Sequence, residues 1–174
     1  MATWLIDPAH SEIGFKVKHL VISTVSGKFT SFDGKVEGDI ENFEKATINF
    51  SADIDSINTG VEQRDGHLKS PDFFDAASHP KLTFQSNKIK SEGGEDYTVE
   101  GNLTIRGVTK PVTLKAEFGG IQTSLYGQTV AGFEVTTKIN RQDYGLTWSD
   151  VTEAGGIVVA DEVKFIANVE LIKQ

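Results

Sequence analysis

No cysteine occurs among the 174 residues, which excludes a disulfide framework and a thiolate metal site. No apolar run is long enough to span a bilayer, and the first residues lack the basic and apolar regions of a signal peptide. We therefore expect a cytoplasmic protein without stable membrane insertion, or an extracytoplasmic one if a leader has been removed.

Basic residues are also scarce, with 17 Lys and Arg against 25 Asp and Glu, so the net charge is −8. This balance argues against nucleic acid and anionic membrane surfaces as partners. Only four prolines occur beside 17 glycines, as suits a β protein with many tight turns. Eleven Phe and an apolar content of 38% supply one core, so we expect a single domain over residues 1–174.

Apolar and polar residues alternate with a period of two along most of the chain, which predicts strands with one buried face. The clearest case places Ala46, Ile48, Phe50, Ala52 and Ile54 on one face. Eight such segments are expected: residues 12–19, 25–40, 46–54, a strand starting near 82, 97–105, 112–118, 131–139 and 163–171. Phe29 is out of phase with Phe32, which predicts a bulge between them. Because an open sheet would need protected edges, the pattern favours an all-β fold, an eight-stranded antiparallel up-and-down barrel.

The stretch from Asp55 to His79 breaks this alternation. Residues 61–69 read as a short charged helix, and Ser70 with Pro71 is typical of the start of another helical turn. The adjacent Phe73 and Phe74 need a buried location. We therefore expect a helical insert between strands three and four that covers one side or end of the barrel.

The inward faces mix large apolar residues with small ones, so the interior is either a tapering channel or a solid core, and the sequence does not decide between them. The residues predicted to line an apolar channel share the inward parity or belong to the insert. They are Phe15, Val17, His19, Val36, Phe50, Ala52, Phe73, Phe74, Phe84, Leu103, Ile105, Leu114, Phe133, Val135, Phe165 and Ala167.

Four polar residues are candidates for binding a head group: Arg64, Asp65, His67 and Arg141. Bracing of the insert is the favoured role for Arg64 and Asp65, and an ion pair between Arg141 and Asp143 is the favoured role for Arg141. The four histidines show no metal-binding spacing, so no metal site is predicted. No nucleophile elbow, phosphate-binding loop or dinucleotide fingerprint is present, and we predict no catalytic residues and no cofactor.

Six groups of residues, taken in order, resemble the YceI family of polyisoprenoid-binding proteins. They are Trp4-x-Ile6-Asp7-Pro8-x-His10-Ser11-x-Ile13-x-Phe15, the pair Asp55 and Ser56, Arg64-Asp65-x-His67-Leu68-x-Ser70-x-Asp72-Phe73-Phe74-Asp75, Pro80-x-Leu82-x-Phe84, Gly101-x-Leu103-Thr104-Ile105-Arg106-Gly107-Val108-Thr109-Lys110-Pro111-Val112, and Arg141-x-Asp143-Tyr144-Gly145-Leu146. The resemblance implies a lipocalin-like barrel that holds an isoprenoid chain, such as a polyprenyl phosphate or a quinone tail. It also implies a binder or carrier rather than an enzyme, and a homodimer.

Two other functions remain open from the sequence. One is an enzyme that acts on a small apolar or lipid-like substrate at the barrel mouth, through Arg64, Asp65 and His67. The other is a filled barrel that serves as a stress-related interaction module.

Overall fold

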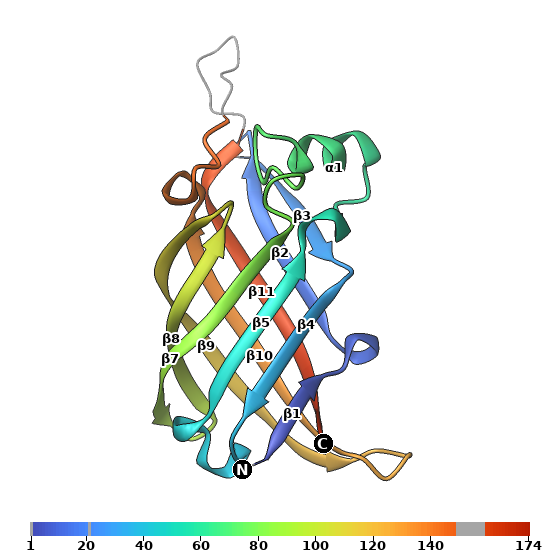
Figure 1. Cartoon of the computed structure of the whole chain (residues 1–174), viewed down its shortest axis with the longest axis vertical. Coiled ribbons are helices and arrows are strands. Elements are labelled where there is room, and N and C mark those ends of the chain that lie inside the picture. The colour runs from blue at the N-terminus through green and yellow to red at the C-terminus, as the bar shows by residue number, and fades with distance from the viewer. Residues whose placement is uncertain (1, 21, 149–158) are drawn as a thin grey trace.

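The computed structural model describes residues 2–20, 22–148 and 159–174, and these form one antiparallel sheet closed into a barrel (Figure 1). The strands are β1 (Thr3–Ile6), β2 (Glu12–His19), β3 (Ser23–Phe29), β4 (Phe32–Glu37), β5 (Thr47–Asp53), β6 (Ile57–Asn58), β7 (Lys81–Gly93), β8 (Asp96–Ile105), β9 (Val108–Thr123), β10 (Thr129–Asn140) and β11 (Val159–Lys173). The short 3-10 helices are η1 (Pro8–His10), η2 (Ile40–Lys45), η3 (Ile54–Ser56) and η4 (Arg141–Tyr144), and the α helix is α1 (Glu62–Lys69).

These strands fill eight positions around the barrel, because three positions each hold two short strands in line. β1 and β2 share the first position, and both pair with β11. The next position holds β4, which pairs with β1, and β3, which pairs with β2. The third holds β5, which pairs with β4, and β6, which pairs with β3. β11 also pairs with β10, so the sheet has no free edge at its closing seam. The predicted eight-stranded antiparallel barrel with a helical insert is confirmed.

Two of the expected strands have different limits in the structure, because the chain is interrupted at η1 and between β3 and β4. The first strand was expected from Glu12, but β1 precedes it, separated by η1. Asp7 caps η1 and Pro8 fixes its first turn, so this short helix interrupts the alternation of apolar and polar residues between β1 and β2. The second expected strand is two strands, because the chain bends between Phe29 and Phe32, where the sequence predicts a bulge.

β9 extends to Thr123, although the sequence predicts a looser region from Gly119 onward. The register of β9 against β10 shifts between Gly132 and Phe133, so that Gly120 pairs with Gly132 while Phe118 pairs with Phe133. One extra residue in β9 changes which residues of the strand face inward beyond this point. A search for strict alternation of apolar and polar residues therefore does not detect this part of the strand.

The two ends of the barrel are closed differently. α1 and the following turn lie across one end, and Phe73 and Phe74 of that turn are buried (Figure 1). The predicted helix over residues 61–69 is confirmed as α1, whereas Ser70 starts a hydrogen-bonded turn, with Phe73 N donating to Ser70 O over 3.0 Å. η2 joins β4 to β5 at the opposite end, close to both chain termini.

The long connection after β10 begins with η4, and its residues 149–158 lie outside the described part of the chain. Within the described part, no helix is long and apolar enough to cross a membrane.

Gly101 shows how tightly the barrel wall is packed. A Cβ atom placed at Gly101 would lie 2.6 Å from Phe84 Cζ and would also collide with the carbonyl oxygen of Gln85. Glycine at this position therefore allows the Phe84 ring to lie against the β8 backbone.

We predict that Gly101→Ala lowers the free energy of unfolding by about 1–3 kcal/mol, the usual cost of overpacking a core. Urea denaturation of the two proteins measures this difference. Gly132→Ala is the matched control, since a Cβ there meets no atom within 4 Å. Equal stability of the two variants would contradict the packing role of Gly101.

Candidate functional site

An apolar cavity of about 160 Å³ occupies the interior of the barrel. Its wall receives side chains from all eight barrel positions, and the side chains that face it are almost all aliphatic or aromatic. Several inward residues that line it, among them Ile48, Phe50, Val135 and Val169, are only partly buried although they face away from bulk solvent. The interior is therefore hollow in its central part rather than solid.

Nine of the predicted channel residues line this cavity. They are Val36, Phe50, Phe84, Leu103, Leu114, Phe133, Val135, Phe165 and Ala167. Ala52 and Ile105 do not line it, and both are packed in the core with 1% of their surface exposed.

The small inward residues divide in the same way. Gly34, Ala116 and Ala167 border the cavity, whereas Ala52 and Ala131 are fully buried against larger neighbours. Small residues thus create space at some positions and accommodate large side chains at others.

A second cavity of about 220 Å³ lies at the end of the barrel that α1 covers. It contains the other five predicted channel residues, which are Phe15, Val17, His19, Phe73 and Phe74. Of the four head-group candidates, Arg64, His67 and Arg141 line it and Asp65 does not. We call this second cavity the mouth chamber and the first one the barrel chamber.

Aromatic side chains stand between the two chambers. Phe29 lines the barrel chamber, and its ring lies 5.8 Å from that of Phe15 and 6.4 Å from that of Phe74, which line the mouth chamber. Phe165 lines both chambers and is their shared wall. Phe29 was not among the predicted channel residues, because the break after β3 places it out of phase with the strand that follows.

Arg64 and Asp65 brace the start of α1. Asp65 Oδ1 accepts hydrogen bonds from Thr59 N and Thr59 Oγ1, over 2.8 and 2.6 Å. Arg64 Nε donates to Thr59 Oγ1 and its Nη2 donates to Thr59 O, each over 2.8 Å. The carboxylate of Asp65 thus faces the loop before the helix, while the Arg64 side chain also reaches the mouth chamber.

Arg141 is 2% exposed and donates to the backbone instead of pairing with Asp143 as expected. Its guanidinium binds the carbonyl oxygens of Leu146, Trp148, Ala160 and, more weakly, Val159, over 2.6 to 3.3 Å. Asp161, at 3.5 Å, is its carboxylate neighbour. Burial lowers the pKa of Arg141 from its ordinary value, and Asp161 opposes that shift. The residue ties the segment after η4 to the start of β11.

His67 links the polar and aromatic parts of the mouth. Its Nε2 lies 2.9 Å from Asp72 Oδ2, and its ring meets Trp148 at 4.8 Å and Phe73 at 5.1 Å, both edge to face. Sequence reasoning missed Trp148 and Leu146, which line this chamber. Their only signal was that they are apolar residues within a connection that otherwise shows no strand pattern.

The sequence and the fold are similar to those of known proteins. A family model described as a YceI-like domain matches residues 4–171. The UPF0312 protein SA2479 of Staphylococcus aureus (strain N315) is 40% identical over 173 residues, which cover 98% of this chain and 97% of that protein.

Solved structures give the same result. A Campylobacter jejuni YCEI protein is 32% identical with a TM-score of 0.77, covering 97% of this chain and 96% of its own. A polyisoprenoid binding domain from Saccharophagus degradans shares the fold at 18% identity, with a TM-score of 0.68 and 98% of both chains covered.

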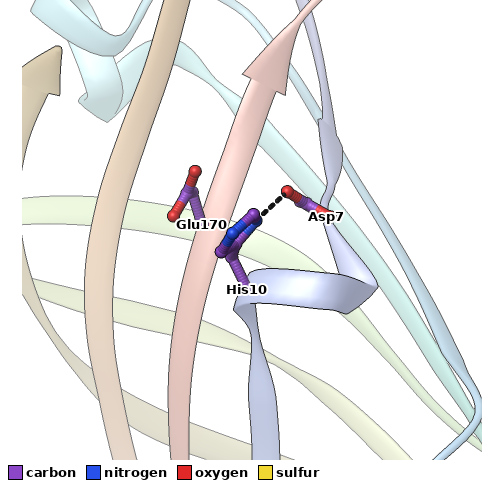
Figure 2. Close-up of side chains that lie close together, drawn as sticks. All are labelled: Asp7, His10 and Glu170. Carbon is purple, nitrogen blue, oxygen red and sulfur yellow. Dashed lines mark hydrogen bonds and ion pairs between the residues drawn. The ribbon is translucent and has the colours of Figure 1, made fainter. Parts of the chain in front are cut away.

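A polar cluster lies on the outer surface, away from both chambers. Figure 2 shows His10 between Asp7 and Glu170, which β11 carries. One ligand atom from each residue lies within 4.8 Å of the others, an arrangement that could hold a metal ion. His10 Nδ1, however, already lies 2.7 Å from Asp7 Oδ2. Glu170 is 160 residues away from His10 in sequence, so the spacing of histidines could not reveal this group.

The hydrogen bond to Asp7 raises the pKa of His10 above its ordinary value of 6.5, and the same bond lowers the pKa of Asp7 below 3.8. Because the His10 pKa is raised on folding, its stabilisation is complete below pH 6.5 and is lost as the pH rises through the raised pKa. The Asp7 pKa is lowered, so its stabilisation is present above pH 3.8 and is lost as the pH falls through the lowered pKa. Both contributions are present between these two values.

We predict that Asp7→Asn returns the pKa of His10 toward 6.5, while asparagine keeps the cap of η1. An NMR titration of the His10 ring measures the shift. Asp33→Asn, at an exposed site on β4, is the control and should leave the titration unchanged. A His10 titration that is the same in Asp7→Asn and wild type would contradict the pairing.

Proposed function

The chain belongs to the YceI-like family, and we propose that its barrel binds an isoprenoid lipid with an anionic head group, such as a polyprenyl phosphate. The tail occupies the barrel chamber and the head group lies in the mouth chamber. The observation that carries this proposal is the position of an apolar cavity next to a second chamber, with which it shares the Phe165 side chain and to whose lining Arg64, His67 and Arg141 belong.

The barrel chamber supplies the affinity. Each methylene-sized group moved from water into an apolar site contributes about 0.8 kcal/mol. A branched isoprenoid chain matches a wall in which aromatic rings and small residues alternate, such as Phe133, Phe165 and Ala167. Ordering of the tail reduces this gain without reversing it.

The mouth chamber supplies the preference for an anion. His19, Arg64, His67 and Arg141 line it, and no Asp or Glu from the described chain is among its lining residues. Lys18 also borders the chamber, but its Nζ donates to Thr24 Oγ1 on the exposed face of the sheet. Among the described residues, the lining thus includes two guanidinium groups and no carboxylate, while Asp72 and Asp161 lie beside His67 and Arg141 outside the chamber. Guanidinium and ammonium groups bind phosphate oxygens through charge-assisted hydrogen bonds, whereas a quinone offers only neutral carbonyls.

The polar groups at the mouth also favour binding over catalysis. Arg64 and Asp65 are held by Thr59, Arg141 is held by backbone carbonyls, and His67 Nε2 faces Asp72. Groups with these partners fix the shape of the mouth. The polyisoprenoid binding domain of Saccharophagus degradans has the same barrel fold, which supports the same class of ligand for this chain.

The first test fills the barrel chamber. Delipidated protein is titrated with a polyprenyl phosphate, and bound lipid is detected by native mass spectrometry. We predict that Ala167→Phe weakens binding about tenfold, because the new ring displaces about two methylene-sized groups of the tail. Asn168→Phe places the same ring on the outer face and should bind as wild type does. If wild type takes up no prenyl lipid, the proposed function is wrong.

The second test concerns the head group. We predict that Arg64→Gln weakens binding of a polyprenyl phosphate by about ten- to a hundredfold, the usual effect of losing a hydrogen bond to a charged group. Binding of the uncharged polyprenol should change little. Lys28→Gln removes a positive charge from an exposed site outside the chamber and serves as control. An equal loss for phosphate and alcohol would show that Arg64 only braces the fold.

A further inference from the structure

At the end opposite α1, the segment η2 contributes one residue to the lining of the barrel chamber, and we call this end the floor. Ile40 and Phe43 are the buried residues of η2, which closes the barrel end opposite α1. Phe43 is 3% exposed and lines the barrel chamber. Unlike the other aromatic residues that line the chamber, it comes from a connecting segment rather than from a strand of the wall.

Two wall residues fix the orientation of the Phe43 ring. It stacks on Phe133 of β10, with ring centroids 4.9 Å apart and an angle of 29° between the planes. It also meets Tyr97 of β8 edge to face at 5.0 Å. Phe133 in turn contacts Phe118 at 5.2 Å. The ring is thus held by packing from two sides rather than free to swing aside.

The local backbone of η2 brings Phe43 into this position. Asn42 has a non-helical conformation, with φ −129° and ψ 53°, so the segment bends immediately before Phe43. Asn42 N donates to Asp39 O and Ala46 N donates to Phe43 O, over 3.0 Å in both cases. These bonds on each side of Phe43 anchor the residue between the ends of β4 and β5.

We propose that Phe43 sets the length of the apolar tail that the barrel accepts. This inference rests on the proposed function, in which the head group is held in the mouth chamber. The far end of the tail then points away from Arg64 and His67 and toward η2. A tail that reaches the Phe43 ring fills the chamber, and further carbons must fold back or stay outside the apolar wall.

The experiment compares prenyl phosphates of increasing length, from geranyl through farnesyl and geranylgeranyl to longer polyprenyl phosphates, on delipidated protein. Wild-type affinity should rise with tail length and then level off. Phe43→Ala should move this plateau to longer tails and raise the preference for the longer over the shorter probe about tenfold. Phe43→Trp, which keeps an aromatic floor but extends further into the chamber, should move the plateau to shorter tails.

Phe118→Ala is the matched control, because it removes a ring of the same size from the same aromatic group but from a wall strand. It should leave the length preference unchanged. An unchanged plateau in both Phe43 variants, or an equal shift in Phe118→Ala, would overturn the inference. Far-UV circular dichroism identifies variants that fail to fold, and if Phe43→Ala is one of them, Phe43→Trp decides the question alone.

The same titration separates this inference from the proposed function. Wild type that binds no prenyl phosphate refutes both. If wild type binds prenyl phosphates and both Phe43 variants show the same preference for tail length, the proposed function stands and the role of Phe43 is refuted.

Discussion

The pairing of β11 is the constraint on which the rest of the molecule depends. Its C-terminal part pairs with β1, its N-terminal and middle parts pair with β2, and along most of its length it also pairs with β10. The sheet closes only because this one long strand bridges the break made by η1. Closure at eight positions removes the sheet edges and limits the interior to a width that side chains nearly fill.

Within that width, cross-strand register decides where the interior is hollow. Ala52 pairs with Phe32 on one side and with Leu82 on the other, and these larger side chains cover it completely. Ala167 pairs with Val135 and Ile13, which leave open space above it. Gly101 is a third case, since its missing side chain admits the Phe84 ring. Gly34 and Ala116 also border the cavity although they pair with Phe50 and Tyr97, so a small residue leaves open space only where the side chain of its partner does not cover it.

The dependence of the cavity on cross-strand register explains which features could be predicted from the sequence and which could not. The parity of each strand follows from residues close together in sequence, and it correctly predicted the barrel, the insert and most of the inward residues. Whether Ala52 or Ala167 borders a cavity depends on partners up to 154 residues away, which single-strand patterns do not specify. The partners of Arg141 were missed for a different reason: backbone carbonyls carry no sequence signal, so Asp143 was the visible but wrong choice. Phe43 was overlooked because η2 shows no alternation.

The two ends of the barrel differ in the polarity of the residues that line them. At the η2 end, the ring of Phe43 is packed against Phe133 and Tyr97, and it offers a ligand only apolar contact. At the α1 end, aromatic rings and basic side chains line the same chamber, and Arg141 is anchored by at least three carbonyl groups within 3 Å. Because charge is costly to bury without partners, the proposed function requires an amphiphile to bind with its charge at the α1 end. Much of this asymmetry lies in the connections, because Arg64 and His67 belong to α1, Arg141 to η4 and Phe43 to η2. A barrel with the same eight-position wall and different end segments would therefore select a different ligand.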